Sequence, residues 1–344
     1  MVPMAVTIKE LSAACGLSVS TVSKALNDYP DVSHETRELV RDTAAKMGYR
    51  PSAIARGLKI GRTFNLGVLY SDESGSGLTH SYFSPVLEAF KNEAERRGYD
   101  ITFITHHMGR SPMTYLEHCL YRNVDGVCIV CSDFTDPEVI ELVSGSLPVV
   151  TVDHVFHNHS CVASENRQGM AELTAHILSM GHTRVSYILG EQTSVSDVRM
   201  TSFIRTMHDA GLTVPESYIV RSKYHNPAAA REATERLLRL SQRPTCIIMA
   251  DDYAALGGLE AIRDAGLRVP QDISVAGYDG VGILQMCRPQ LTTVHQDTLR
   301  IGQAAARKLV HLIEQPHTTF QEIISIPSRL IPGETVGPVP ADLP

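Results

Sequence analysis

Short polar and basic side chains are interspersed with apolar ones in residues 7–27, TIKELSAACGLSVSTVSKALN, where a Thr–Val–Ser segment would present small polar groups outward. The stretch predicts two short helices joined by a tight turn, because Gly16 interrupts the apolar pattern. Thr7 and Glu10 fit a capping box at the first helix, and Ser18 is placed to cap the second. The predicted arrangement is a helix-turn-helix, which lays its second helix in the major groove.

The second predicted helix has an inner and an outer face. Val22 and Leu26 are four residues apart and would face inward. The outer face would carry Val19, Ser20, Ser23 and Lys24. A third helix should begin at Ser33 and end at Gly48, with an apolar face formed by Leu39, Val40 and Met47.

Charge is divided unevenly along the chain. Residues 1–62 hold nine Lys/Arg and six Asp/Glu, a net charge of +3, whereas the whole 344-residue chain carries −7 and the remainder therefore −10. A small cationic head on an anionic body is typical of a DNA-binding protein with a separate regulatory body. The length suits two or three domains.

Composition and motifs argue against several classes of protein. The sequence has no apolar run near the ~20 residues that span a bilayer and no signal-peptide core, so we expect a cytoplasmic protein without membrane contact. Seven scattered cysteines indicate reduced thiols. Nucleotide-binding glycine motifs are missing and no nucleophile–base pair stands out, so we expect neither an enzyme nor a cofactor.

From Phe64 onward, apolar segments alternate with amphipathic ones. Strands are expected at 65–70, 100–105, 126–131, 148–153, 184–189, 245–250 and 273–279. Helices are expected at 85–97, 137–143, 167–180, 198–210, 227–240 and 254–265. Near-continuous apolar strands that alternate with helices predict parallel sheets covered on both faces. The number of strands favours two doubly wound sheets with a ligand cleft between them.

Polar and aromatic side chains at strand ends form the second group that could do chemistry. Asp251 and Asp252 follow one predicted strand and Asp279 ends another, where ligands of such sheets bind. Their carboxylates could accept hydrogen bonds from sugar hydroxyls, although Asp252 and Asp279 could instead cap local structure. Tyr82 and Phe83 open the first crossover and could stack on a ring or belong to the core.

The chain resembles the LacI/GalR family of bacterial transcription regulators over about residues 6–331. The resemblance rests on VTIKELSAACGLSVSTVSKALN, YRPSAIARGLK, GHTRVSYI, VPQDISVAGYD and RPQLTTVHQD, which occur in this order. It implies a homodimer that grips a near-palindromic double-stranded DNA operator. It also implies that a small molecule bound in the cleft alters operator affinity.

The implied fold is an all-α helix-turn-helix head plus an α/β periplasmic-binding-protein-like core of two doubly wound parallel-sheet subdomains. The head would cover residues 1–50, the hinge helix and linker 51–62, and the core 63–334. Within the core, the N-subdomain would take about 63–160 plus 292–321, and the C-subdomain about 161–291 plus 322–334. Residues 335–344, rich in Gly and Pro, would form a disordered tail.

The resemblance assigns DNA contacts to the head and hinge. Val19, Ser20 and Lys24 would read bases, while Thr21 and Ser23 would fix register on phosphates. The full predicted DNA-binding set is Thr7, Ser18, Val19, Ser20, Thr21, Ser23, Lys24, Asn27, Ser52, Ala55 and Leu58. The alternative is that they are only solvated polar residues. Many relatives carry Arg or His at the position of Lys24. A lysine ammonium lacks the bidentate fork of an arginine, so the half-site sequence stays open.

The resemblance adds Arg199 and Tyr224 to the strand-end and crossover residues, and Gln296 lies where the chain returns and could add a polar contact. The full predicted effector-binding set is Tyr82, Phe83, Arg199, Tyr224, Asp251, Asp279 and Gln296. Arg199 stands where the family places a ligand-binding arginine, whose fork suits paired hydroxyls or a carboxylate. Three departures are Asp251 in place of an amide common in sugar-responsive relatives, Glu165 in place of an aspartate, and Thr193 near a second arginine of purine-responsive relatives.

A sugar or sugar derivative is therefore the expected effector, and a repressor of a carbohydrate-utilisation operon is the expected function. A purine-type co-repressor is the alternative. Two other classes remain open, a sugar-binding protein without DNA regulation and a doubly wound enzyme. The cluster of Asp153, His154, His157, His159 and Cys161 could bind zinc or copper, but its spacing fits no closed site and we expect a solvated loop without metal.

Residues 52–59 are predicted to fold as a hinge helix only when packed on a partner, because isolated helices below ~12 residues are marginal in water. Leu58 matches the family's minor-groove wedge, although an isolated leucine is more often core, and Ala55 is small enough for two hinges to meet. We therefore expect Leu58→Ala or Ala55→Asp to weaken operator binding strongly and to leave effector binding intact. Unchanged affinity of Leu58→Ala in a gel-shift titration would refute the wedge.

Overall fold

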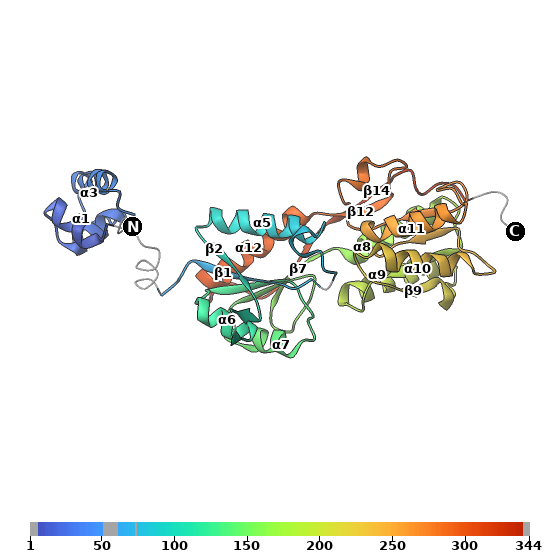
Figure 1. Ribbon diagram of the computed structural model, residues 1–344, viewed down its shortest axis with the longest axis horizontal. Helices are drawn as coiled ribbons and strands as arrows, with labels where there is room; N and C mark the ends of the chain where they lie inside the picture. The colour runs from blue at the N-terminus through green and yellow to red at the C-terminus, as the bar shows by residue number, and fades with distance from the viewer. Residues whose placement is uncertain (1–5, 51–60, 73, 110, 340–344) are drawn as a thin grey trace. The chain divides into compact units, whose positions relative to one another are not determined.

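A computed structural model describes residues 6–50, 61–72, 74–109 and 111–339 of the chain (Figure 1). The chain divides into two compact units, Met1–Phe64 and Asn65–Pro344. Ser52, Ala55 and Leu58, the three predicted hinge contacts, lie outside the described residues. No helix in the described part of the chain has the length and apolar character that crossing a bilayer requires.

The described part of the first unit is a head of three helices. Its helices are α1 (Ile8–Cys15), α2 (Val19–Leu26) and α3 (His34–Met47). The predicted capping box is present, since the Thr7 hydroxyl accepts from the Glu10 N–H and the Glu10 carboxylate accepts from the Thr7 N–H at 2.7 Å. Gly16 ends α1 in the left-handed conformation, which glycine adopts without steric cost.

Six buried residues form the core of the head: Leu11, Val22, Ala25, Val32, Val40 and Ala44. The expectation that Leu39 belongs to this apolar face is wrong, because its side chain is 49% exposed. Val40 and Ala44, four residues apart, take the inner face of α3, and Leu39 lies one residue off that stripe.

The first half of the core is a six-stranded parallel sheet in the order β13-β7-β6-β5-β1-β2. Its strands are β1 (Asn65–Tyr70), β2 (Asp100–Ile104), β5 (Gly126–Cys131), β6 (Val149–Val152), β7 (Ser160–Ser164) and β13 (Ile323–Ile326). Its helices are α5 (Phe83–Arg96), α6 (Tyr115–Arg122), α7 (Pro137–Ser144) and α12 (Thr298–Glu314). The pair α5 and α12 covers one face and the pair α6 and α7 the other (Figure 1).

The second half is a four-stranded parallel sheet in the order β11-β10-β8-β9. Its strands are β8 (Val185–Leu189), β9 (Ile219–Arg221), β10 (Cys246–Ile248) and β11 (Ser274–Ala276). Its helices are α8 (Asn166–Ser179), α9 (Ser194–Asp209), α10 (Pro227–Leu238) and α11 (Asp252–Asp264). Helices α8 and α9 pack on one face and α10 and α11 on the other. Two doubly wound parallel sheets confirm the predicted fold class.

Short elements complete the core. They are the antiparallel pairs β12 (Thr293–Gln296) with β14 (Ser328–Ile331) and β3 (His107–Met108) with β4 (Ser111–Pro112), and the 3-10 helices η1 (Gly77–Thr79), η2 (Glu216–Tyr218) and η3 (Leu284–Met286). The segments β7, β9, β12, β13 and β14, and the helices α6 and α12, were not among the predicted elements.

Two predicted boundaries fall a few residues too early. Both β7 and β13 belong to the first sheet and pair with each other in parallel, from Ile323 opposite Cys161 to Ile326 opposite Ser164. The chain therefore leaves the first half after Ser164 and again after Ile326, rather than near residues 160 and 321. These strands are short and contain serine, so their apolar signal is weak.

The expectation of a disordered tail from residue 335 is wrong for residues 335–339. Thr335 is buried and its carbonyl accepts from the Val275 N–H at 2.9 Å. The Gly337 carbonyl lies 2.9 Å from Nε2 of the buried His182, and the Val339 N–H donates to Met180. The Gly and Pro residues here shape an extended segment that packs on the second half.

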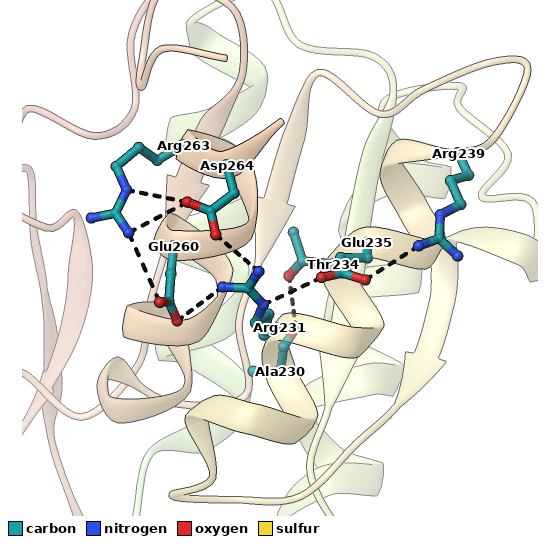
Figure 2. A network of polar contacts seen from close by, with 8 residues as sticks. All are labelled: Ala230, Arg231, Thr234, Glu235, Arg239, Glu260, Arg263 and Asp264. Carbon is teal, nitrogen blue, oxygen red and sulfur yellow. Dashed lines mark hydrogen bonds and ion pairs between the residues drawn. The ribbon is translucent and has the colours of Figure 1, made fainter. Parts of the chain in front are cut away.

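Helices α10 and α11 are held together by a charged network and by a close backbone approach. Figure 2 shows Arg231 of α10 between Glu260 and Asp264 of α11, with nitrogen–oxygen distances of 3.2 and 2.9 Å. Gly257 of α11 faces the Pro227 carbonyl so closely that a Cβ would lie 1.8 Å from its oxygen. Only glycine fits this approach, because a rigid backbone atom blocks any side chain.

We expect Gly257→Ala to lower the free energy of unfolding by about 2–3 kcal/mol, because the two helices must separate to admit the methyl group. Gly282→Ala is the matched control, since a Cβ there meets nothing within 4 Å. Urea unfolding followed by circular dichroism measures both. Equal stabilities of the two variants would contradict the close packing.

Candidate effector site and DNA-binding face

The buried side chain of Arg199, on α9, lies at the centre of the predicted effector residues. It is only 3% exposed, and its Nε donates to Asn166 Oδ1 at 2.7 Å. Its guanidinium carbon lies 3.6 Å from the centroid of the Tyr278 ring, a cation–π contact. Burial opposes its charge, but Tyr278, Tyr224 and Asp279 nearby raise the pKa of Arg199 above its ordinary value.

Asp279 and Gln296 form a pair beside this cation. Asp279 has a left-handed φ of 108°, and its Oδ1 accepts from Gln296 Nε2 at 2.6 Å. Burial raises the pKa of Asp279 well above its ordinary value, and Arg199 opposes this shift. Gln296 is 1% exposed, and its Oε1 has no hydrogen-bond donor among the described residues. A buried acceptor of this kind can receive a hydrogen bond from a ligand.

Tyr82 comes from the first half of the core and reaches the same region. Its hydroxyl donates to Asp153 Oδ2 at 2.7 Å, and it interacts electrostatically with Asp279 and Arg199 of the second half. Asp153 is held by the Ser164 N–H at 3.1 Å, and burial raises its pKa. The sequence placed Asp153 only in the histidine-rich cluster, so its position beside Tyr82 was missed.

Tyr224 joins the site through the loop after β9. Its hydroxyl lies 2.7 Å from Ser196 Oγ, and its N–H donates to Glu191 Oε2 at 2.7 Å. A Cβ on Gly190 would lie 2.3 Å from the Tyr224 ring, so the absence of a side chain at 190 admits the ring. Glu191 and Ser196 were not predicted from the sequence, although they follow the end of β8, Glu191 in the loop and Ser196 in the first turn of α9.

The two consecutive carboxylates Asp251 and Asp252 have structural partners. Asp251 caps α11, accepting from the Ala254 N–H at 2.7 Å, and its other oxygen accepts from the His225 N–H at 2.6 Å. Asp252 accepts from Thr293 Oγ1 at 2.5 Å, and burial raises its pKa to about 7. The capping role considered for Asp252 thus belongs to Asp251, whose contact with an effector stays a prediction.

Phe83 begins α5, and its ring packs edge-on against Tyr70 at 5.7 Å and beside His80 at 4.8 Å. The histidine-rich segment is packed rather than solvated at His154, whose ring stacks on Phe134 at 4.1 Å, and Cys161 is buried. Within the described ranges, no three His, Cys, Asp or Glu side chains are arranged to hold a metal ion.

The predicted DNA-binding residues of the head differ in whether they already have a polar partner. Val19 and Ser20 are exposed at the start of α2. The other polar members have partners inside the head: Thr7 with Glu10, Ser18 with Thr21, Asn27 with the Ser23 carbonyl, and Lys24 with Asp31. The ion pair with Asp31 raises the pKa of Lys24, and Asp31 was not singled out in the sequence.

Comparison with known proteins matches both units. The profile of bacterial regulatory proteins of the lacI family matches residues 7–52, and that of the periplasmic binding protein-like domain matches residues 174–336. The HTH-type transcriptional repressor PurR of Haemophilus influenzae is 30% identical over 336 residues, covering 96% of this chain and 98% of the relative. PurR of Mannheimia succiniciproducens is 31% identical over 335 residues, covering 96% and 98%.

The chain belongs to the lacI family of bacterial regulatory proteins. Its fold agrees with a lac repressor dimer bound to operator and the anti-inducer ONPF, at a TM-score of 0.81 and 24% identity over 97% of this chain and 99% of that one. A complex of the transcriptional regulator CelR with cellobiose gives a TM-score of 0.71 at 24% identity, covering 96% and 99%. Members of the lacI family are DNA-binding regulators, which identifies α1 to α3 as the DNA-binding head.

We expect Asp31→Asn to strengthen DNA binding by this lacI-family head roughly two- to fivefold, the scale of an exposed ion pair, because Lys24 no longer has to leave a carboxylate. Asp42→Asn makes the same charge change on α3 without touching Lys24 and is the control. Fluorescence anisotropy with an operator fragment compares them. Equal gains would show that only net charge matters.

Proposed function

We propose that this lacI-family protein is a homodimeric repressor that binds a near-palindromic operator, and that a sugar or sugar derivative bound between the halves of its core controls operator affinity. The observation that carries the effector proposal is the buried pair of Arg199 and Gln296 Oε1. The Arg199 guanidinium offers hydrogen-bond donors. Gln296 Oε1 is an acceptor that receives no hydrogen bond from the described residues. Such groups suit a ligand rich in both donors and acceptors.

The surrounding side chains favour a hydroxylated ligand. Asp153 and Asp279 are carboxylates in a buried setting, and carboxylates accept hydrogen bonds from hydroxyl groups. The rings of Tyr82 and Tyr224 border the same region and could cover the apolar face of a sugar ring. A single guanidinium among these carboxylates also disfavours a strongly anionic ligand.

A purine co-repressor is the second candidate. The relatives at 30–31% identity are repressors named PurR, and the adjacent rings of Tyr82 and Phe83 could stack on a base. Against it, Thr193 stands near the place of a second arginine, and its hydroxyl caps α9 by accepting from the Ser196 N–H at 3.2 Å. The fully formed head argues against a sugar-binding protein without DNA regulation.

The proposed mechanism is linkage between two sites. Closing the core on an effector would change how the paired hinges, residues 51–62, meet the operator. Effector and operator must then change each other's affinity by the same factor, typically 5- to 150-fold. Exposed apolar side chains in the second half, such as Leu256 on α11 and Ile283 and Met286 near η3, suit the subunit contact that a dimer needs.

A thermal-shift screen of sugars and purine bases, followed by operator binding with each hit, tests the proposal. Arg199→Met should abolish the ligand-induced shift, whereas Arg205→Met, an exposed arginine on the same helix, should keep it. If Arg199→Met does not fold, Arg199→Lys is the substitute. It preserves the charge and tests the role of the planar guanidinium. Loss of the shift in both Met variants would contradict the assigned site.

Operator affinity of the full chain should fall steeply between about 50 and 200 mM salt, because phosphate neutralisation releases counterions. A flat salt response would contradict DNA binding itself. A hit among purines but not sugars would select the second candidate and leave the linkage mechanism in place.

A further inference from the structure

Three aromatic rings stack in a row between the two halves of the core. His80 follows η1 in the first half, His225 follows β9 in the second, and Tyr253 lies in the first turn of α11. The His80 and His225 ring centroids are 4.0 Å apart with planes 22° apart, and those of His225 and Tyr253 are 4.0 Å apart with planes 19° apart. His80 therefore contacts the second half face to face.

Both histidines are bonded to residues of the proposed effector site. His80 Nδ1 accepts from the backbone N–H groups of Tyr82 at 3.2 Å and Phe83 at 3.4 Å. The backbone N–H of His225 donates to the Asp251 carboxylate at 2.6 Å and so fixes the position of the residue rather than its imidazole. An imidazole nitrogen accepts only when it carries no proton, so protonated His80 loses both bonds at the start of α5.

The rings also face charged neighbours. Asp72, in the loop after β1, interacts with both imidazoles, and Asp251 interacts with His225. Burial, followed by His225, lowers the pKa of His80 to about 4, which outweighs the opposing effect of Asp72. Burial also lowers the pKa of His225, against Asp251 and Asp72. Both rings are therefore neutral near pH 7.

We propose that His80, His225 and Tyr253 form a ring clasp that holds the two halves of the core closed over the effector site, and that protonation of its imidazoles opens the clasp. The proposal rests on the proposed function, since it adds proton control to the same site. Two imidazolium rings at stacking distance repel each other, and protonated His80 releases the start of α5.

The direction of the pH dependence follows from the depressed pKa values. The clasp stabilises the closed state fully above the pKa of a free imidazole, ~6.5, and this contribution is lost as the pH falls. With the pKa of His80 at about 4 when closed and ~6.5 when open, lowering the pH from about 7.5 to about 5.5 shifts the equilibrium roughly tenfold toward the open state.

The chain contains no tryptophan, so Phe83→Trp introduces a single fluorescent reporter beside His80, whose ring centroid lies 4.8 Å from that of Phe83, and keeps both imidazoles. In the full chain at pH 7.5, this indole should be packed against His80 and resist acrylamide quenching. Between pH 7.5 and 5.5, quenching should rise several-fold as protonated His80 releases the start of α5 and the halves separate, while far-UV circular dichroism stays native. Quenching that stays constant over this range would overturn the clasp.

Two double variants separate the ring from the proton. With Phe83→Trp and His80→Phe, quenching should be the same at pH 7.5 and pH 5.5, because the ring at position 80 no longer takes up a proton. With Phe83→Trp and His225→Asn, whose asparagine tolerates the left-handed φ of 51° at this position, quenching should be high throughout, because the stack is lost. The Asn variant keeps the test decisive if the Phe variant does not fold, and a pH response that persists in it would contradict the proposal.

Histidine carbon-13 NMR of the unsubstituted chain supplies an independent readout. The His80 signal, assigned by its loss in His80→Trp, should titrate well below pH 6.5, and titration near 6.5 would contradict a closed stack. These measurements need neither effector nor operator. A negative result for the clasp would therefore leave the operator-binding and thermal-shift results unaffected. Likewise, the clasp can be tested even if the protein does not bind an operator.

Discussion

A buried guanidinium is the constraint on which the rest of the core depends. Removing a charge from water costs several kcal/mol unless partners replace the lost hydration. Arg199 meets this cost with the Asn166 side chain, the Tyr278 ring and the field of Asp279. Together with Arg199 itself, these partners come from three separate segments of the second half of the core. The second sheet and its helices must therefore be in place before this part of the site exists.

The site holds more buried carboxylates than cations. Asp153, Asp251, Asp252 and Asp279 all have raised pKa values, with burial as the largest cause. Asp251 and Asp252 are engaged by backbone and threonine donors, so they organise α11 and the loop after β11. Beside Asp279, the buried Gln296 Oε1 has no hydrogen-bond donor among the described residues. A ligand hydroxyl would supply that donor, which explains why binding could stabilise one arrangement of the halves.

The sequence predicted the parts of this core that have strong local signals. The strands at 65–70 and 126–131 are near-continuous apolar runs, and the capping box at Thr7 depends on two residues three apart. Three-residue β9 and the edge strands β13 and β14 lack such runs, so only their pairing reveals them. The tail at 335–339 contains Gly and Pro, and its order depends on contacts with His182 and Val275.

The site residues that the sequence did not predict were missed for one physical reason: their contacts join segments far apart in the chain. Asp153 is recruited by a left-handed backbone turn and by Tyr82, 71 residues away in the chain. Asn166 meets Arg199 across 33 residues. Contacts of this kind leave no periodic pattern in the sequence. Arg199, by contrast, was found because family resemblance marks its position, and Asp279 because it ends a predicted strand. The structure places the two residues beside each other.

A double-mutant cycle of Arg199→Met and Asp279→Asn, measured by urea unfolding, tests the central claim most directly. If the buried charges compensate each other, each single variant loses stability and the double variant loses at least about 1 kcal/mol less than the sum. Losses that add within about 0.3 kcal/mol would show that the two charges do not interact, and the account of the site built on them would be wrong.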